Sequence, residues 1–303
     1  MRYDPTAPHP HPRRRPVTAR LRLAAAALLL AALPASWADG RTRAPTAPVA
    51  VGLPHIVPVT GGSNFRDIGG YPTVDGKRVR FGLVFRSAST DYLTAADIRL
   101  VQRLGIRVFY DLRDAPERRP DRPDGVSFPP VITWPDQPSQ SMDFSSGAAA
   151  ERAMRDGYAH MPEAYARPIG DIFRRIAAGD TPLAYNCSAG KDRTGLTTAL
   201  LLTLLGVPRD IVMRDYMVSN RTFAPPTTGG SAAVPVTALT IAPAAMAVLK
   251  GVQQDWLATA FAAIERRYGS VQNYYREGLG LSDAEVRAIR ARLLEPGRGS
   301  GRS

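Results

Sequence analysis

The feature that most constrains this chain is a segment at positions 187–195, which reads Cys-Ser-Ala-Gly-Lys-Asp-Arg-Thr-Gly. A short apolar run at 183–185 precedes it, and a longer run at 194–205 follows it and ends at Gly206. This pattern predicts a strand, a tight loop and a helix in direct succession. Because such a loop points backbone N–H groups into one small volume, with the positive end of the helix dipole behind them, it predicts an oxyanion-binding site.

The residue types in this loop supply a nucleophile and a clamp for a phosphoryl group. Cys187 precedes the helix N-terminus and lies near Lys191 and Arg193, so the local field favours its thiolate, which is the nucleophilic form. Arg193 can hold two equatorial oxygens at once, and it binds most strongly when charge spreads over the transition state. The hydroxyl of Thr194 is placed to hydrogen-bond the departing thiolate. We therefore predict attack of Cys187 on phosphorus and a cysteinyl-phosphate intermediate.

The other loop residues complete the predicted phosphate cradle. Ala189 and Gly190 are small enough for the backbone and the oxyanion to approach closely, and Ser188 and Lys191 belong to the same turn. A buried structural cysteine beside a glycine turn is the alternative, but the other residue types in this context disfavour it. The chain has one cysteine, so no internal disulfide can form, and it lacks the Gly-x-x-x-x-Gly-Lys-Ser/Thr pattern of a nucleotide-binding loop. None of its four histidines has a partner at a spacing that suggests a metal site.

The motif Cys-x5-Arg followed by Thr-Gly resembles the signature loop of the protein tyrosine phosphatase superfamily. Its Ala-Gly-Lys-Asp-Arg interior is similar to that of the bacterial and fungal tyrosine/serine and lipid phosphatase branch. Further segments resemble other blocks of this branch, and they lie at 64–71, 85–87, 110–113 with Glu117, 215–216 with 219–220, 268–270 and 279–282. The resemblance implies an α/β phosphatase fold with a central, mostly parallel sheet flanked by helices, no metal and no organic cofactor.

The resemblance also suggests residues around the loop, and one position departs from it. Asn64, Arg66 and Asp67 belong to the opening motif. They are expected either to line the pocket mouth as substrate-binding residues or to form a turn that braces the phosphate loop. Family members usually carry His directly before the nucleophile, where this chain has Asn186. Since Asn can hydrogen-bond the backbone but carries no charge, we expect a weaker or alkaline-shifted enzyme.

Two aspartates are candidates for the general acid that protonates the leaving oxygen. Asp192 lies inside the loop, and the corresponding residue of the resembling branch has been considered for this role. Asp136 ends the tripeptide Trp-Pro-Asp at 134–136, which resembles the segment that holds the acid in animal-type tyrosine phosphatases. We favour Asp192. The alternatives are a structural ion pair for Asp192 and a solvated loop carboxylate for Asp136.

The remaining pattern predicts one α/β phosphatase domain over residues 55–295, with additional helices towards the C-terminus. Strands are predicted at 83–85, 106–110, 131–134 and 183–185, and Thr94 with Asp97 predicts a capped helix between the first two. Such a strand–helix–strand unit indicates a parallel sheet. A mobile loop or lid is predicted at 221–240. Other helices are predicted at 149–178, with breaks near Pro162 and Pro168, and at 208–219, 243–267, 270–277 and 282–294.

The N-terminus has the pattern of an export signal over residues 1–38. Arginines at 13–22 precede an apolar run at 23–33, and small residues at 36 and 38 fit a cleavage site. The run is shorter than the roughly 20 residues that span a bilayer, so we expect a secreted or cell-envelope protein without stable membrane insertion after cleavage. An uncleaved anchor is the alternative. Residues 39–54 are predicted to be a linker and residues 296–303 a disordered tail.

The net charge of +12 does not predict a nucleic-acid partner, because it is concentrated at the ends of the chain. Residues 1–43 carry +6 and residues 296–303 carry +2, which leaves +4 for the predicted domain. A basic surface that binds nucleic acid would lie on a folded face.

The predicted substrate is a phosphorylated protein, with phosphotyrosine as the leading target. The charge of Lys191 beside the phosphate site favours a polyanion, so a phosphoinositide or dual-specificity phosphatase is one alternative. A catalytically weak phosphate-binding pseudophosphatase, indicated by Asn186, is another. Arsenate chemistry is disfavoured, because a single cysteine cannot resolve its intermediate through an internal disulfide.

Overall fold

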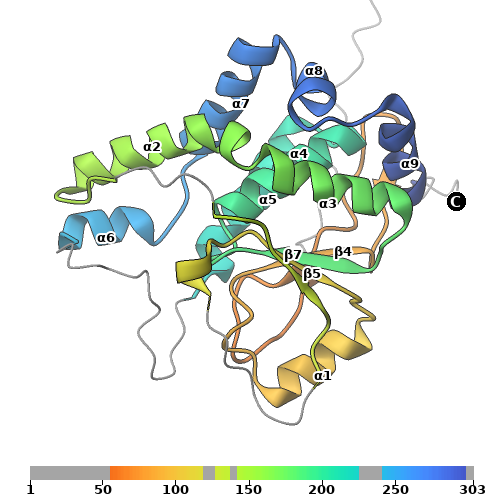
Figure 1. Cartoon of the computed structure of the whole chain (residues 1–303), viewed down its shortest axis with the longest axis horizontal. Helices are drawn as coiled ribbons and strands as arrows, with labels where there is room; N and C mark the ends of the chain where they lie inside the picture. Colours follow the sequence, from red (N-terminus) through yellow and green to blue (C-terminus); the bar gives the residue numbers. More distant parts are fainter. Residues whose placement is uncertain (1–54, 119–126, 137–141, 225–240, 298–303) are drawn as a thin grey trace, which may run out of the picture. The chain divides into compact units, whose positions relative to one another are not determined.

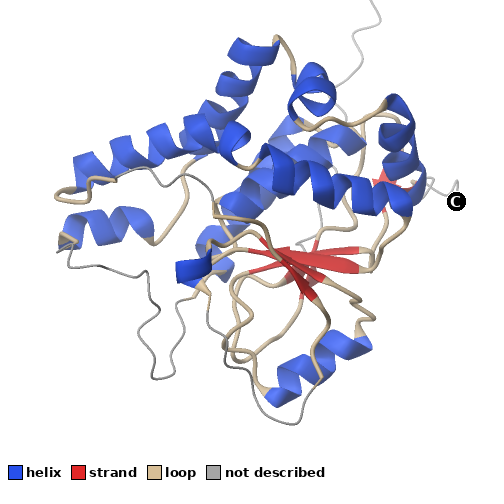
Figure 2. Cartoon of the chain, in the orientation of Figure 1, coloured by secondary structure: helices blue, strands red, loops and turns tan. Residues whose placement is uncertain are grey.

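The computed structural model describes residues 55–118, 127–136, 142–224 and 241–297. The predicted signal peptide, nearly all of the predicted loop at 221–240 and most of the predicted tail lie outside these residues, as does the predicted linker. The described residues form an α/β fold with a central sheet between helices (Figure 1; Figure 2).

The central sheet is mostly parallel, with the strand order β1-β2-β4-β7-β5-β6. β2 pairs antiparallel with β1 and β4, whereas β4, β7, β5 and β6 run parallel. The strands are β1 (His55–Ile56), β2 (Arg66–Asp67), β4 (Val84–Ser87), β5 (Phe109–Asp111), β6 (Val131–Ile132) and β7 (Leu183–Asn186). The predicted fold class is therefore confirmed, with strand ends shifted by at most three residues.

Alternation of side chains along the strands places apolar residues on both faces of the sheet. In β5, Phe109 belongs to one core cluster and Tyr110 to the other. The cluster of Phe109 is covered by α1 (Ala95–Arg103), which begins at the predicted capping box. The cluster of Tyr110 is covered by α4 (Arg193–Leu205), an apolar helix that is buried on nearly all sides. α4 is therefore fixed along its length, and so is the loop that precedes it.

The other helices lie on the α4 side of the sheet (Figure 1). α2 packs along α6 and α7, and α3 packs against α9. The helices are α2 (Gly147–Ala164), α3 (Ala166–Ala178), α5 (Arg209–Thr222), α6 (Pro243–Leu249), α7 (Gln254–Tyr268), α8 (Val271–Asn273) and α9 (Asp283–Leu293), with short turns η1 (Ala115–Glu117) and η2 (Tyr274–Gly278).

Two predicted helices have different boundaries in the structure. The segment 243–267 forms two helices, because Asn220 holds the backbone N–H and carbonyl of Val252 and so fixes a turn between α6 and α7. The break in 149–178 lies at Tyr165 and not at either proline. Pro168 lies in the first turn of α3, where a missing N–H costs no helical hydrogen bond, and Pro162 lies within the last turn of α2.

The end of the described chain also differs from the prediction of a tail from Pro296. Leu294–Pro296 forms β8, which pairs antiparallel with β3 (Lys77–Val79) in a second, small sheet. Because the Gly297 N–H also donates to the Gly76 carbonyl, backbone pairing extends two residues into the segment that the composition assigned to the tail.

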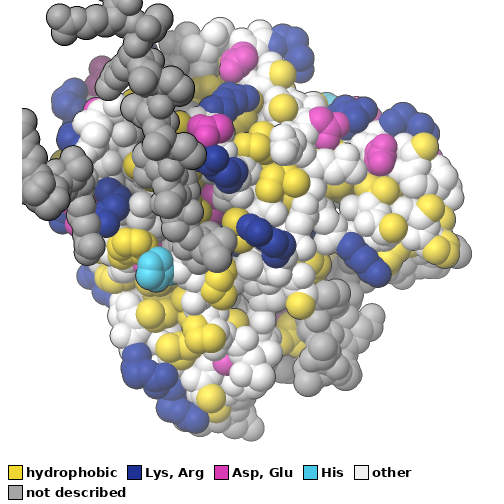
Figure 3. Space-filling model, turned by 180° about the vertical axis from the view of Figure 1, so that it is seen from behind, with side chains coloured by type: hydrophobic (Ala, Val, Ile, Leu, Met, Phe, Trp, Pro, Cys, Tyr) yellow, Lys and Arg dark blue, Asp and Glu magenta, His cyan; other side chains and the backbone are white. Residues whose placement is uncertain are grey.

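The described residues were predicted to bind neither a membrane, a metal nor a nucleic acid, and three features of the structure concern these partners. None of their helices combines the length and hydropathy of a membrane span. Within the same residues, no three His, Cys, Asp or Glu side chains gather as a metal site would require. On the face opposite to that of Figure 1, basic side chains are spread among acidic, apolar and uncharged ones (Figure 3). That part of the described surface carries no continuous basic patch.

Candidate active site

The predicted phosphate loop lies where three parallel strands end. β4, β7 and β5 end in register at Ser87, Asn186 and Asp111, and residues 187–192 connect β7 to α4. In open α/β sheets, ligand sites form at the carboxyl ends of the strands. Cys187, buried directly after β7, is therefore at the edge of the sheet where a ligand site is expected.

Gly190 turns the loop at a point where a side chain does not fit. Its φ is +64°, which is the left-handed region that favours glycine. A Cβ at this position would lie 2.3 Å from the carbonyl oxygen of Ser87. The loop is also tied to the segment after β4, because the Ser89 N–H donates to the Ser188 carbonyl at 3.1 Å. The phosphate loop is therefore packed directly on the end of β4.

Asn64 and Arg86 brace the loop from behind. Asn64 Nδ2 donates to the Gly190 carbonyl at 2.7 Å, and Arg86 Nη2 donates to the same oxygen at 2.8 Å. Arg66 in turn donates to the side chain and the carbonyl of Asn64. Asn64 and Arg66 are buried, so the structure places them as the brace and not at the pocket mouth, whereas Asp67 accepts from two backbone N–H groups outside the loop.

A buried charge cluster lies behind this brace. Asp215 of α5 pairs with Arg66 at 3.3 Å and with Arg86 at 2.9 Å, and Tyr71 donates its hydroxyl to Asp215 at 3.0 Å. Burial alone would raise the pKa of Asp215, but the two guanidinium charges outweigh burial and lower it. Burial, together with the charge of Arg86, lowers the pKa of Arg66 to about 10. Two arginines against one aspartate leave an excess positive charge behind the loop, which favours an anion in front of it.

Glu117 holds Arg193 in a bidentate pair. Arg193 Nη1 and Nη2 donate to Glu117 Oε2 and Oε1 at 2.6 and 2.5 Å, and Nη1 also donates to the Leu112 carbonyl at 3.1 Å. The Ser188 hydroxyl donates to the same carboxylate. Burial would raise the pKa of Glu117, but the hydrogen bonds and charge of Arg193 lower it to about 2. The guanidinium of Arg193 is therefore fixed beside the loop.

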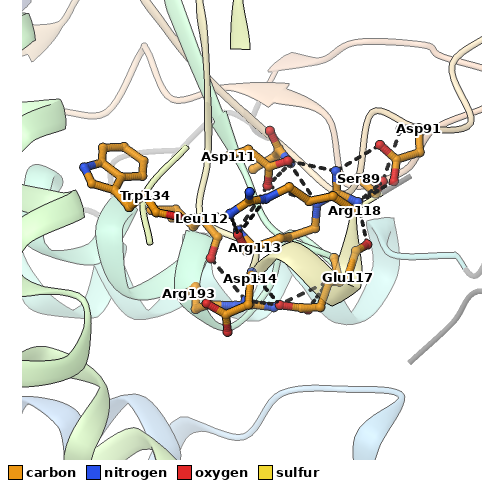
Figure 4. A network of polar contacts seen from close by, with 12 residues as sticks. Ser89, Asp91, Asp111, Leu112, Arg113, Asp114, Glu117, Arg118, Trp134 and Arg193 are labelled. Carbon is orange, nitrogen blue, oxygen red and sulfur yellow. Dashed lines mark hydrogen bonds and ion pairs between the residues drawn. The ribbon is translucent and has the colours of Figure 1, made fainter. Parts of the chain in front are cut away.

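A second ion network fixes the chain between β5 and Glu117 (Figure 4). Arg113 donates to both carboxylate oxygens of Asp111 and of Asp91, and to the Ser89 hydroxyl. Burial would lower the pKa of Arg113, but the two carboxylates raise it. Arg113 Nη1 also donates to the Glu117 carbonyl at 3.1 Å. This network therefore sets the position of η1, and with it the Glu117 side chain that binds Arg193.

Among the described residues, the buried polar atoms that have no hydrogen-bond partner include Asn186 Oδ1, directly before the nucleophile, and Thr194 Oγ1. Asn186 Nδ2 donates to Asp111 Oδ1 at 3.1 Å, so the residue that stands where the family usually has His is linked to the network of Arg113. An unpaired buried hydroxyl carries a desolvation cost. The Thr194 hydroxyl is therefore available as a donor at the start of α4.

Asp192 and Lys191 contact each other and also residues of α2 and of the turn after α6. The Tyr158 hydroxyl donates to Asp192 Oδ1 at 2.8 Å, and Lys191 Nζ lies 3.5 Å from Asp192 Oδ2. Lys191 Nζ also donates to the carbonyls of Leu249 and Gly251, both at 2.7 Å. Lys191 is buried, and its ammonium is held by the turn after α6 and by the adjacent Asp192.

The alternative acid, Asp136, is exposed and lies beside the first residue of η1. Its Oδ1 accepts from the Ala115 N–H at 2.6 Å, and Trp134 Nε1 donates to Asp171 of α3 at 2.8 Å. The structure therefore places Asp136 near the turn that carries Glu117, whereas Asp192 lies within the loop itself.

The structure adds three residues to the predicted site: Arg86, Glu117 and Tyr158. Arg86 and Glu117 lie in segments that resemble family blocks, so the sequence carried a signal for them. Tyr158 carried none, because its partner lies 34 positions away in a different element.

Comparisons with known proteins agree with this geometry. The chain matches the model of a tyrosine phosphatase family over residues 57–295. It is 34% identical over 236 residues to a protein of Cupriavidus necator that is named as a tyrosine-protein phosphatase, covering 74% of this chain and 84% of that protein. It is 30% identical to the triple specificity protein phosphatase PtpB of Mycobacterium tuberculosis, covering 77% of this chain and 97% of that protein. A tyrosine-protein phosphatase of Nostoc commune is 27% identical over 70% of this chain and 74% of its own length.

Proposed function

Because the chain belongs to the tyrosine phosphatase family, which confirms the resemblance of its sequence, we propose that it hydrolyses phosphotyrosine in proteins through a cysteinyl-phosphate on Cys187. One observation carries this proposal. Arg193 is fixed by Glu117 beside the loop that follows β7, and the loop begins with Cys187. A nucleophile and a preoriented guanidinium on one rigid loop are what phosphoryl transfer to sulfur requires.

In the first step, the Cys187 thiolate attacks phosphorus, and the bond from phosphorus to the tyrosine oxygen breaks. Asp192 gives its proton to the leaving phenoxide. In the second step, water attacks the cysteinyl-phosphate, the Asp192 carboxylate takes a proton from that water, and the P–S bond breaks. The Thr194 hydroxyl, unpaired in the structure, donates to the departing thiolate. Inorganic phosphate leaves, and Cys187 and Asp192 return to their starting states.

Asp192 is the proposed acid because it is part of the loop and its carboxylate is oriented by Tyr158. Asp136 has its carboxylate bound to the Ala115 N–H, at the first residue of η1. Asp136 therefore lies outside the loop that begins with Cys187, which is the second reason for favouring Asp192.

Hydrolysis of p-nitrophenyl phosphate without added metal, between about pH 4 and 9, tests this assignment. The reduced native protein is compared with Cys187→Ser, Asp192→Asn and Asp136→Asn. We expect turnover by the native chain and none by Cys187→Ser. The two aspartate variants are compared on phenyl phosphate, whose poor leaving group needs the proton, and the acidic-side advantage should be lost in Asp192→Asn alone. If the native chain binds vanadate but does not hydrolyse the substrate, the protein is a pseudophosphatase. Asn186→His then tests whether the residue before Cys187 is the cause of the lost activity.

For the substrate, phosphotyrosine is favoured over a phosphoinositide. The sequence argument for a polyanion rests on Lys191, whose ammonium is buried and donates to two backbone carbonyls. The PtpB relative is named a triple specificity phosphatase, so serine and threonine phosphates belong in the test. Turnover of matched phosphotyrosine, phosphoserine and phosphothreonine peptides and of a soluble phosphoinositide ranks these classes. A preference for the phosphoinositide would contradict the proposal.

We also propose that residues 1–38 direct export, on the pattern of arginines, apolar run and small residues. Mass spectrometry of the mature protein from the culture medium or cell envelope should find an N-terminus at residue 39. Retention of residues 1–38 would support the uncleaved anchor.

A further inference from the structure

We propose that Tyr158 and Tyr216 form a hydroxyl chain that positions Asp192 and selects the carboxylate oxygen that carries the catalytic proton. This inference rests on the function proposed above, with Asp192 as the general acid. Tyr216 of α5 donates to the Tyr158 hydroxyl at 2.7 Å, and Tyr158 of α2 donates to Asp192 Oδ1 at 2.8 Å. The chain therefore joins two helices to the N-cap residue of α4.

The direction of the chain follows from the proton count. Each phenol has one proton to donate. Since the Tyr158 oxygen accepts the hydrogen bond from Tyr216, the hydroxyl hydrogen of Tyr158 points to Asp192. Burial raises the pKa of both phenols, so both remain protonated donors at neutral pH. Tyr158 is thus a permanent donor to Oδ1.

The hydrogen bond from Tyr158 to Oδ1 determines which oxygen of Asp192 carries the acid proton. Oδ1 already accepts from Tyr158, so a proton there would compete with that hydrogen bond. Oδ2 has the longer contact, 3.5 Å to Lys191 Nζ, and that ammonium is also held by two backbone carbonyls, so the proton is carried by Oδ2. In the first step, Oδ2–H gives its proton to the leaving oxygen as the P–O bond breaks. In the second step, Oδ2 takes a proton from water, and Tyr158 keeps its own proton throughout.

The two tyrosines are fixed by packing, whereas the carboxylate of Asp192 is not. Tyr158 is fully buried, its ring lies 6.3 Å from that of Tyr216 in an edge-on arrangement, and the Trp256 ring lies 5.9 Å away. The side chain of Asp192 keeps 22% exposure, so it is open to solvent and to a substrate. Without the hydroxyl of Tyr158, this carboxylate could rotate about its terminal bond. Loss of such alignment can reduce a rate by one or two orders of magnitude.

The charged and titratable groups that face this chain come from the loop, from α2, α5 and α7, and from β4, where the charge of Arg86 also acts on Tyr216. Lys191 is adjacent to Asp192 on the loop itself, and the two tyrosines face it from α2 and α5. Asp255 of α7 acts on Tyr216 electrostatically, and Arg155 of α2 pairs with Asp255 at 2.6 Å. Removing the Tyr158 hydroxyl leaves these charges in place and removes one donor from the carboxylate.

The test is Tyr158→Phe in the full chain, assayed on aryl phosphates with good and poor leaving groups. We expect kcat/KM to fall about tenfold for phenyl phosphate and less than about twofold for p-nitrophenyl phosphate, because only the poor leaving group needs the proton. The matched control is Tyr274→Phe, which removes a buried hydroxyl that also donates to α2, at the Pro162 carbonyl. It should leave the leaving-group dependence unchanged.

A double-mutant cycle separates positioning from structure. In an Asp192→Asn background, Tyr158→Phe should cause no further loss on phenyl phosphate. Tyr216→Phe, which keeps the bond from Tyr158 to Asp192, should show the same pattern with a smaller loss, and it provides the test if Tyr158→Phe does not fold. An equal loss on both substrates, or an undiminished loss in the Asp192→Asn background, would overturn the inference while the phosphatase function stood. Absence of Cys187-dependent turnover in the native chain would overturn both.

Discussion

Replacement of Glu117 by Gln is expected to weaken the site and the fold together, with a pH dependence that identifies the cause. Arg193 lowers the pKa of Glu117 from 4.5 to about 2, against the opposing effect of burial. A shift of that size corresponds to about 3 kcal/mol of folding stability that is present when Glu117 is ionised. Because the folded-state pKa is depressed, this stability is fully present above about pH 4.5 and is lost as the pH falls towards 2.

Urea denaturation of the native chain and of Glu117→Gln, followed from neutral pH down to about pH 3, measures this contribution. The variant should be less stable by about 3 kcal/mol at neutral pH, and the difference should shrink as the pH falls below 4.5. The matched control is Glu295→Gln, which breaks a half-buried pair with Arg78 at 2.6 Å and should cost less than about 1 kcal/mol. In parallel, kcat/KM of Glu117→Gln should fall about tenfold or more, because the guanidinium of Arg193 is no longer held in place. If Glu117→Gln is no less stable than Glu295→Gln at neutral pH, or if its deficit does not change with pH, the assignment of Glu117 as the charge partner of Arg193 is wrong.

Three further substitutions test the parts around the loop. Asp215→Asn leaves Arg66 and Arg86 buried without a counter-charge and should lower the free energy of unfolding by about 3–5 kcal/mol, measured by urea denaturation; a loss below about 1 kcal/mol would contradict the buried cluster. Lys191→Met removes the donor to the turn between α6 and α7 and should speed amide hydrogen exchange there while phosphate affinity changes less than about twofold; a large loss of affinity with unchanged exchange would restore the substrate-binding role predicted from the sequence. Gly190→Ala places a Cβ against the end of β4 at a residue with positive φ, and it should abolish vanadate binding measured by calorimetry. The control Gly76→Ala is also at positive φ but has open space around it, so it should retain vanadate binding.

The parts of the site that are local in sequence could be predicted from it. The order of strand, loop and helix around Cys187 depends on neighbouring residues, so apolar periodicity and the glycine positions were sufficient. The capping box of α1 and the left-handed cap at Gly206 were found for the same reason. These features require no knowledge of which segments pack together.

The parts that depend on tertiary contacts could not be predicted in the same way. The opening motif was compatible with two roles for Asn64 and Arg66, lining the pocket mouth or bracing the phosphate loop. Only their burial behind the loop distinguishes between these roles. The charge of Lys191 suggested a substrate contact, but the turn after α6 takes its ammonium. That turn also divides a segment whose sequence reads as one continuous helix, because Asn220 fixes it from α5. In each case the deciding partner lies far away in the chain.

The central claim is that the catalytic phosphoryl group passes through the sulfur of Cys187. The most direct test is to quench the native protein in acid during turnover of a phosphotyrosine peptide and to map the modified residue by mass spectrometry. The mechanism predicts a peptide containing Cys187 that carries one added phosphoryl group, formed in Asp192→Asn as well and absent from Cys187→Ser. Turnover that persists in Cys187→Ser, or a phosphoryl group trapped on any other side chain, would contradict the claim.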